Sequence, residues 1–365
     1  DFLHFYVLGE IAAAGRADIL YDAPAQHARQ VSLVPASKDT WFVPIYGPQT
    51  ALVFMTLARL PYLWAALCWS LLTGVGYAAC VWLVWRRLPG LRASGGNVLL
   101  AAAAFPPFYS LLQHGQTSVI PLLCVTGAFL ALRGEHRATA GFALGSLIFK
   151  PQFGIAIAVV MVARREWRVV GGAVAAIALQ WIGPMLLWGP EPMRQYLGAL
   201  GQGPALAALL EPKLHQLHSL RGFSTLLLGS SAANWVLVAI LGAVALVIAV
   251  RLWQPRIPLE TRFSALLLAT ILVAPHAGIY DLVLLVPAFL LTAALAGEAG
   301  DRGCRTLRAI LYVAYVALLV GPLAAATRLQ LSVPLLLAWL WEIHRVSFEA
   351  GGSRGGARPV VSSAP

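Results

Sequence analysis

The sequence predicts an all-α membrane protein, in which a polytopic bundle of helices crosses or enters a lipid bilayer. Of its 365 residues, 59% are hydrophobic and only 11% are charged, whereas soluble domains carry about 25% charged residues. Apolar runs close to the length of a spanning helix also recur along the chain. A chain this apolar has too little polar surface to cover a soluble particle.

The apolar runs differ in length. The longest cover residues 61–85, 168–189, 231–250, 278–296, 306–322 and 325–342. Shorter runs lie at 97–112, 117–132, 138–149, 151–163 and 263–276, and these are too short to cross upright at 1.5 Å per residue. Short segments must be buried by their neighbours or line a cavity. We therefore expect about eleven membrane segments. Because the sequence begins at Asp1 with no apolar run before it, we also expect one N-terminal helix to be missing.

The basic residues predict the orientation of the chain. Basic residues exceed acidic ones by 11, and loops rich in arginine favour the cytoplasmic side. Arg137 and Arg164 would then share that side, with the chain rising and returning between them. Pro151 breaks this segment, so 138–149 and 151–163 predict a helical hairpin with Lys150 at its outer apex.

Three regions follow from this path. We expect an extracytoplasmic first loop with short helices at 1–60, a transmembrane bundle at 61–345 with an outer loop at 190–230, and a disordered cytoplasmic tail at 346–365. The lysines and arginines do not gather on one segment, which argues against a nucleic-acid partner.

Several kinds of site are missing from the sequence. Cys68, Cys80 and Cys124 lie in apolar runs and Cys304 lies in a basic loop, so their spacing predicts neither a disulfide nor a zinc site. No Gly-rich phosphate loop, HExxH or G-x-S-x-G motif occurs. We expect no cofactor and no metal.

The polar residues that are hardest to explain by packing all fall on the predicted outer side. Ionisable groups at membrane depth are costly and by default indicate function. These residues are Asp1, His4, Tyr6, Glu10, Gln116, Lys150, His215, His218, Arg221, His276, Tyr280 and Asp281.

Five of them have a structural interpretation beside the functional one. Asp1 is a candidate general base, or an ordinary solvated residue at a helix end. Lys150 is a candidate phosphate ligand, or a lysine that reaches the interface. Arg221 suits bidentate phosphate binding, or it is a solvated loop residue. His276 and Asp281 either pair with each other or orient a sugar and its phosphate.

A series of short elements in this order resembles glycosyltransferase family 87, bacterial membrane mannosyltransferases of the GT-C class that use polyprenyl-phosphate-mannose. The resemblance runs across most of the chain. It is carried by Asp1 through Tyr6, Gly15 with Leu20-Tyr21-Asp22, Phe42 through Pro48, His114-Gly115-Gln116, Phe149-Lys150-Pro151-Gln152, His218 through Gly222, and Ala274 through Leu285. Tyr46-Gly47-Pro48 departs from the family, which commonly has Pro in place of Gly47.

The resemblance implies a GT-C-type bundle and an inverting transferase in the bacterial inner membrane, with its active site facing the periplasm or exterior. Asp1 takes the place of the catalytic aspartate. Lys150, Arg221 and His276 would stabilise the departing phosphate. The remaining candidates, His4, Tyr6, Gln116, His218, Tyr280 and Asp281, would bind substrate. The partners implied are membrane lipids, the lipid-linked sugar donor and a lipid or glycan acceptor.

Two other functions remain open from the sequence. Short helices broken by proline also suit a transporter or flippase for a lipid-linked sugar, although no internal repeat is visible. A membrane scaffold, in which the outer-side residues are only structural, is the other alternative.

Overall fold

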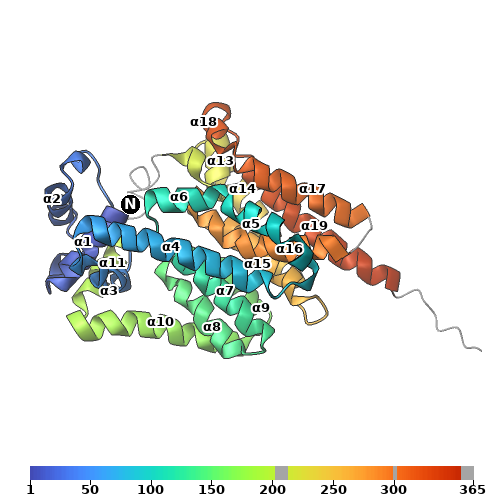
Figure 1. Cartoon of the computed structure of the whole chain (residues 1–365), viewed down its shortest axis with the longest axis horizontal. Helices are drawn as coiled ribbons and strands as arrows, with labels where there is room; N and C mark the ends of the chain where they lie inside the picture. The colour runs from blue at the N-terminus through green and yellow to red at the C-terminus, as the bar shows by residue number, and fades with distance from the viewer. Residues whose placement is uncertain (202–212, 299–301, 355–365) are drawn as a thin grey trace, which may run out of the picture.

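The computed structural model describes residues 1–201, 213–298 and 302–354 (Figure 1). Within these ranges the chain is helical and has no β-strand, and the one β pairing there is an isolated bridge between Leu217 and Gly278. The all-α prediction is therefore confirmed for the part of the chain that the structure describes.

The long apolar helices match the strongest sequence signals. Helices α4 (Tyr62–Trp85), α10 (Trp167–Trp188) and α14 (Ala232–Leu252) and the continuous helical stretch Ile279–Gly297 are long and apolar enough to cross a membrane. The 24 residues of α4 span about 36 Å at 1.5 Å per residue, which exceeds a hydrocarbon core of about 30 Å.

The expected count of about eleven membrane segments is not supported. The described residues contain four such helices, or up to six if two bent pairs each count as one span. One pair joins Pro89–Ala103 to α6 (Pro106–His114) at 42°, and the other joins Cys304–Ala317 to Gly321–Thr327 at 68°. Helix α5 (Gly95–Ala103) belongs to the first pair and α17 (Arg302–Ala317) to the second, and both are labelled in Figure 1.

The shorter runs fold as helices that lie against the longer ones. They form α7 (Val119–Arg133), α8 (Arg137–Gly145), α9 (Gly154–Ala163) and α15 (Leu259–Val273). Helix α15 is buried along nearly its whole length among α9, α14, α16 (Val286–Glu298) and α19 (Ser332–Arg354). The expectation that a short apolar run is buried by its neighbours is therefore confirmed for α15.

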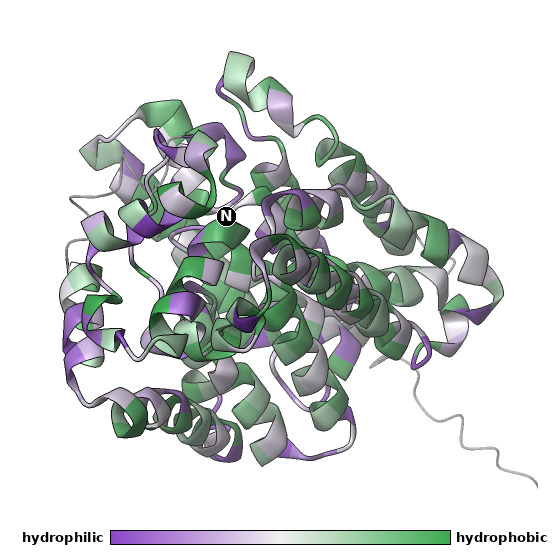
Figure 2. Ribbon diagram, turned by 60° about the vertical axis from the view of Figure 1, so that its left-hand side comes forward, coloured by the Kyte–Doolittle hydropathy of each residue, from purple (hydrophilic) through white to green (hydrophobic). Residues whose placement is uncertain are grey.

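Long helices on the outside of the bundle expose apolar side chains. On α4, Leu63 and Leu71 are 66% and 68% exposed, and on α10 Leu186 is 82% exposed. Figure 2 shows hydrophobic residues dominating the long helices. Such a surface is unfavourable in water and favourable against lipid.

The N-terminal region packs on one end of this bundle. It comprises α1 (Phe2–Ala13), α2 (Ala23–Leu33) and α3 (Pro48–Met55). Helix α11 (Glu191–Gly201) lies against α3 (Figure 1). Phe5 of α1 stacks on Phe54 of α3 with ring centroids 5.2 Å apart. The remaining described helices are α13 (Leu220–Leu228) and α18 (Ala324–Thr327).

Loops that were predicted to share the cytoplasmic side meet at one end of the molecule. Arg137 pairs with Glu166 at 2.8 Å, and Arg133 pairs with Glu260. Trp253 also donates to Glu166 at 3.3 Å. The Arg137–Glu166 pair brings the two ends of the 138–163 segment together, which is the geometry that a hairpin requires.

The C-terminal helix differs from the sequence prediction. Helix α19 begins at Ser332, after the start of the predicted 325–342 span, and continues to Arg354. Residues 346–354 of the predicted disordered tail are therefore helical, and 355–365 lie outside the described residues. Arg345 pairs with Glu342 at 2.6 Å and with Glu349 at 2.7 Å. These i,i+3 and i,i+4 pairs favour the helical conformation of this polar segment.

Candidate active site

A buried lysine lies at the break between two helices. Lys150 separates the 3₁₀ turns Ser146–Phe149 and Pro151–Phe153, and its side chain is only 4% exposed. Its Nζ donates to Asp281 Oδ1 at 2.9 Å and to Ser118 Oγ at 2.9 Å. A buried ammonium is tolerated only when it is paired and hydrogen-bonded, and both conditions are met here.

Asp281 is the counter-ion, and its side chain is fully buried. It lies in the 3₁₀ helix Ile279–Leu285. Its Oδ1 accepts from Lys150 and from Ser118 Oγ at 2.5 Å, and its Oδ2 accepts from the Gly278 backbone N–H at 2.9 Å. Asp281 therefore pairs with Lys150, a partner that sequence reasoning did not propose for it.

Gln116 links the buried lysine to Asp1. Its Nε2 donates to Asp1 Oδ2 at 2.9 Å, and its Oε1 lies 3.4 Å from Lys150 Nζ. Asp1 is exposed, whereas Gln116 is 5% exposed. The Gln116 amide thus contacts both the accessible carboxylate of Asp1 and the buried ammonium of Lys150. We refer to Asp1, Gln116, Ser118, Lys150 and Asp281 together as the polar cluster.

Gly115 allows the first helix to approach this point. It ends α6 with φ +59°, a conformation that glycine adopts without steric cost. A Cβ at this position would lie 2.6 Å from the Phe2 Cβ. The glycine therefore lets α6 end directly against α1, which carries Asp1 at its N-terminus.

Two tyrosines border the polar cluster. The Tyr280 ring lies 5.1 Å from Lys150 Nζ, within the range of a cation–π interaction. Tyr46 is partly buried, and its ring packs on that of Phe5 with centroids 4.9 Å apart. Burial, reinforced by the charge of Asp281, raises the pKa of the Tyr46 hydroxyl, although the Gln116 side chain opposes the shift. The Tyr46 hydroxyl is therefore neutral near pH 7.

Arg221 and His276 belong to two segments that contact each other. Arg221 Nε donates to the backbone carbonyl of Pro275, the residue before His276, at 2.5 Å. The backbone N–H of His218 donates to the Ala277 carbonyl at 2.8 Å. The segment 275–281 therefore contacts the Arg221 loop at its start and carries Asp281, the partner of Lys150, at its end. It connects the three predicted phosphate ligands.

Three predicted substrate ligands make structural contacts. His218 is buried and its Nδ1 lies 2.7 Å from Ser332 Oγ. Burial lowers the pKa of His218 to about 3, although Asp281 opposes the shift, so the ring is neutral near pH 7. Tyr6 donates to the Leu60 carbonyl at 2.8 Å. His4 is buried against the Phe42 ring, with centroids 5.1 Å apart.

The sequence analysis missed Ser118. Ser118 follows Gln116 by two residues at the start of an apolar run, which is an ordinary place for a helix-capping serine. Only the fold shows that its hydroxyl bridges Lys150 and Asp281. Within the described ranges, no group of three or more His, Cys, Asp or Glu residues is arranged to hold a metal ion.

The apolar bundle and its buried polar cluster define a polytopic membrane protein with a candidate active site near one end. Residues 44–275 match the model of glycosyltransferase family 87. This range covers more than half of the chain, and the protein belongs to that family. The match includes Gln116, Ser118, Lys150 and Arg221. Comparisons with curated proteins and with solved structures gave no match. The family identifies the chain as a membrane glycosyltransferase.

Proposed function

We propose that this glycosyltransferase transfers a sugar, with mannose as the first candidate, from a polyprenyl-phosphate donor to a hydroxyl of a lipid or glycan acceptor. In this proposal the reaction takes place on the extracytoplasmic face of the bacterial inner membrane. The observation that carries it is the link from Asp1 through Gln116 to Lys150, with contacts of 2.9 and 3.4 Å.

Asp1 is the general base in this proposal. The acceptor hydroxyl loses its proton to the Asp1 carboxylate as its oxygen attacks the anomeric carbon. The bond from that carbon to the phosphate oxygen breaks on the opposite face, and the lipid phosphate leaves with the electron pair. The configuration is inverted, so a β-linked donor gives an α-linked product. The exposure of Asp1 supports this role, because a general base must reach its substrate within hydrogen-bonding distance.

The departing phosphate requires positive charge where its own charge develops. Lys150, Arg221 and His276 supply it in this proposal. The 275–281 segment supports this grouping, because it contacts Arg221 at Pro275 and pairs with Lys150 through Asp281. Asp281 has no exposed side-chain surface. We therefore propose that it positions Lys150 instead of contacting substrate, and that Tyr280 and Gln116 border the sugar.

The test is a transfer assay on the full-length protein in native-like membranes. Labelled polyprenyl-phosphate-mannose is the donor, and a total lipid and glycan extract supplies acceptors. We expect label in a new product with the wild type and with Asp39→Asn, an exposed aspartate outside the polar cluster, and none with Asp1→Asn.

Each other result has a distinct meaning. Transfer that persists in Asp1→Asn would show that Asp1 is not the base. Transfer only with another lipid-linked sugar would show that the donor sugar is not mannose. Movement of the intact lipid-linked sugar across vesicles, with no transfer from any donor, would favour a flippase and overturn the proposal.

A further inference from the structure

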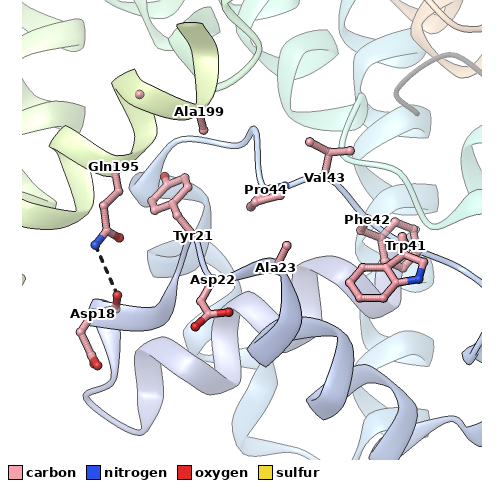
Figure 3. Close-up of a pocket in the computed structure, with 11 residues that line it drawn as sticks. Asp18, Tyr21, Asp22, Ala23, Trp41, Phe42, Val43, Pro44, Gln195 and Ala199 are labelled. Atoms are coloured by element: carbon pink, nitrogen blue, oxygen red, sulfur yellow. Dashed lines mark hydrogen bonds between the residues drawn. The ribbon is translucent and has the colours of Figure 1, made fainter. Parts of the chain in front are cut away.

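A second site lies beside the polar cluster, in the N-terminal region. A pocket of about 580 Å³ opens between the first loop and α11. Figure 3 shows Asp18 and Gln195 on one side of it and Trp41 and Phe42 on the other. Its volume lies in the range of about 300–1,000 Å³ that is typical of small-molecule sites.

The lining combines aromatic and hydrogen-bonding groups without positive charge. Among the described residues that line the pocket, Trp41, Phe42 and Tyr21 are aromatic, Asp22 and Gln195 offer polar side chains, and none is Lys, Arg or His. The nearby Arg16 is not a lining residue and is already paired with Asp18 at 3.1 Å. Sugar rings suit such a lining, because their hydroxyls donate to carboxylates and amides and their C–H faces pack on aromatic rings.

Trp41 is held in place while it stays accessible. Its ring stacks on His27 of α2, with centroids 3.8 Å apart and planes at 12°. It is nevertheless 49% exposed. A large aromatic ring that is fixed on one face and open elsewhere loses little conformational freedom on binding a ligand.

The acidic groups of the pocket are already partly engaged. Asp18 pairs with Arg16 at 3.1 Å, and its backbone carbonyl accepts from Gln195 at 3.5 Å. Asp22 Oδ1 accepts from the Ala25 N–H and caps α2. These contacts reduce the charge available to a cationic ligand and favour a neutral one.

The pocket is connected to the polar cluster through residues 41–46. Trp41 through Pro44 line the pocket, and Tyr46, two residues further on, packs its ring on His4 with centroids 5.8 Å apart. Tyr21, another lining residue, donates to the Tyr46 carbonyl at 2.8 Å. The ring of Phe42 also packs on His4, one turn along α1 from Asp1.

We infer that this pocket binds hexose units of a glycan acceptor and thereby presents an acceptor hydroxyl toward Asp1. The role of the pocket as an acceptor site rests on the proposed transferase function. The binding itself does not depend on a donor or on turnover, so it can be tested separately.

The experiment is saturation-transfer NMR on the full-length protein in lipid nanodiscs, without donor. The nanodiscs are prepared free of sugar-headed detergents, which would occupy the same pocket. The probes are methyl α-mannoside, methyl α-glucoside and methyl β-galactoside, and empty nanodiscs give the background. The variants are Trp41→Ala, Trp41→Phe and Asp22→Asn, with Asp39→Asn as the matched control.

The variants separate recognition from folding. Asparagine retains the capping oxygen of Asp22 but replaces the second oxygen by a donating NH₂, and Trp41→Phe retains an aromatic face. We expect at least one hexoside to bind the wild type. We expect its affinity to fall about tenfold or more in Trp41→Ala and Asp22→Asn, to be largely retained in Trp41→Phe, and to be unchanged in Asp39→Asn.

Two results would overturn the inference: no hexoside binding by the wild type, or equal binding by Trp41→Ala and Asp22→Asn. If hexosides bind as expected while the transfer assay fails with every donor, the sugar site stands and the proposed transferase reaction does not.

Discussion

Lys150 Nζ and Asp281 Oδ1 form an ion pair of 2.9 Å between residues 131 positions apart in the chain. The lysine is 4% exposed and the aspartate 0%. This pair fixes the 275–281 segment against the helix break at Lys150, and the candidate active site is built around it.

We expect Asp281→Ala to destabilise the protein strongly. Removing one member of a buried ion pair costs about 3–5 kcal/mol, because the other charge is left unpaired. Unfolding in nanodiscs, followed by circular dichroism, measures the change. Glu349→Ala is the control, since Glu349 is 63% exposed in its pair with Arg345, and exposed pairs contribute about 0–1 kcal/mol. Equal stability of the two variants would show that the Lys150–Asp281 pair is not buried in the native protein.

The double variant Lys150→Met/Asp281→Leu separates stability from catalysis. Replacing a whole buried pair by apolar groups is often neutral or stabilising, so the double variant should recover most of the loss in Asp281→Ala. It should still lose about 100-fold or more in transfer, because a charge-stabilising donor has been removed. Transfer at the wild-type rate by the double variant would remove Lys150 from the proposed mechanism.

The fold was predictable where a single apolar run is long enough to form a membrane-spanning helix. The spans at 61–85, 168–189 and 231–250 agree closely with α4, α10 and α14. The short run at 263–276 was expected to be buried by its neighbours or to line a cavity, and α15 is buried almost completely. The number of membrane segments was not predictable, because an apolar helix buried by protein and one that faces lipid have the same composition.

The sequence predicted which residues belong to the site, but it did not predict which of them contact each other. Polar and ionisable residues in an apolar chain identified Asp1, Gln116, Lys150 and Asp281. Their contacts depend on tertiary packing across separations such as the 163 residues between Ser118 and Asp281. The sequence therefore suggested His276 as the partner of Asp281, a close neighbour in the chain, in place of Lys150.

Gln116→Glu should change the pH dependence of transfer. A carboxylate in place of the amide that contacts Asp1 at 2.9 Å would disfavour the charged form of Asp1 and raise its pKa. Since the proposed base must be ionised, the acidic limb of the pH–rate profile should move to higher pH. Gln116→Leu is the control: it removes the same hydrogen bond to Asp1 without adding charge, so its upward shift should be smaller than that of Gln116→Glu. Identical profiles for Gln116→Glu and the wild type would count against Asp1 as the base.

Gly115→Ala should destabilise the contact between α6 and α1. The φ of +59° costs a residue with a Cβ about 1–2 kcal/mol, and the new Cβ would also lie 2.6 Å from the Phe2 Cβ. We expect a lower unfolding temperature together with reduced transfer, because Phe2 adjoins Asp1. Gly74→Ala in α4 is the control, as a Cβ there meets nothing within 4 Å. If the two variants have the same unfolding temperature and transfer rate, α6 and α1 do not approach each other closely at Gly115.

His218 should make the protein less stable in mild acid. Burial lowers its pKa to about 3 in the folded protein, from an ordinary value of 6.5, so in mild acid the unfolded chain binds a proton that the folded chain does not. This contribution is absent above about pH 6.5 and destabilises the fold progressively as the pH falls toward 3, by about 2 kcal/mol at pH 5. His218→Asn lacks the titrating group, so the stability difference between wild type and variant should shrink or reverse from pH 7.5 to pH 5. Unfolding curves of both proteins at the two pH values measure it. A difference that stays constant would show that His218 is not buried in its neutral form.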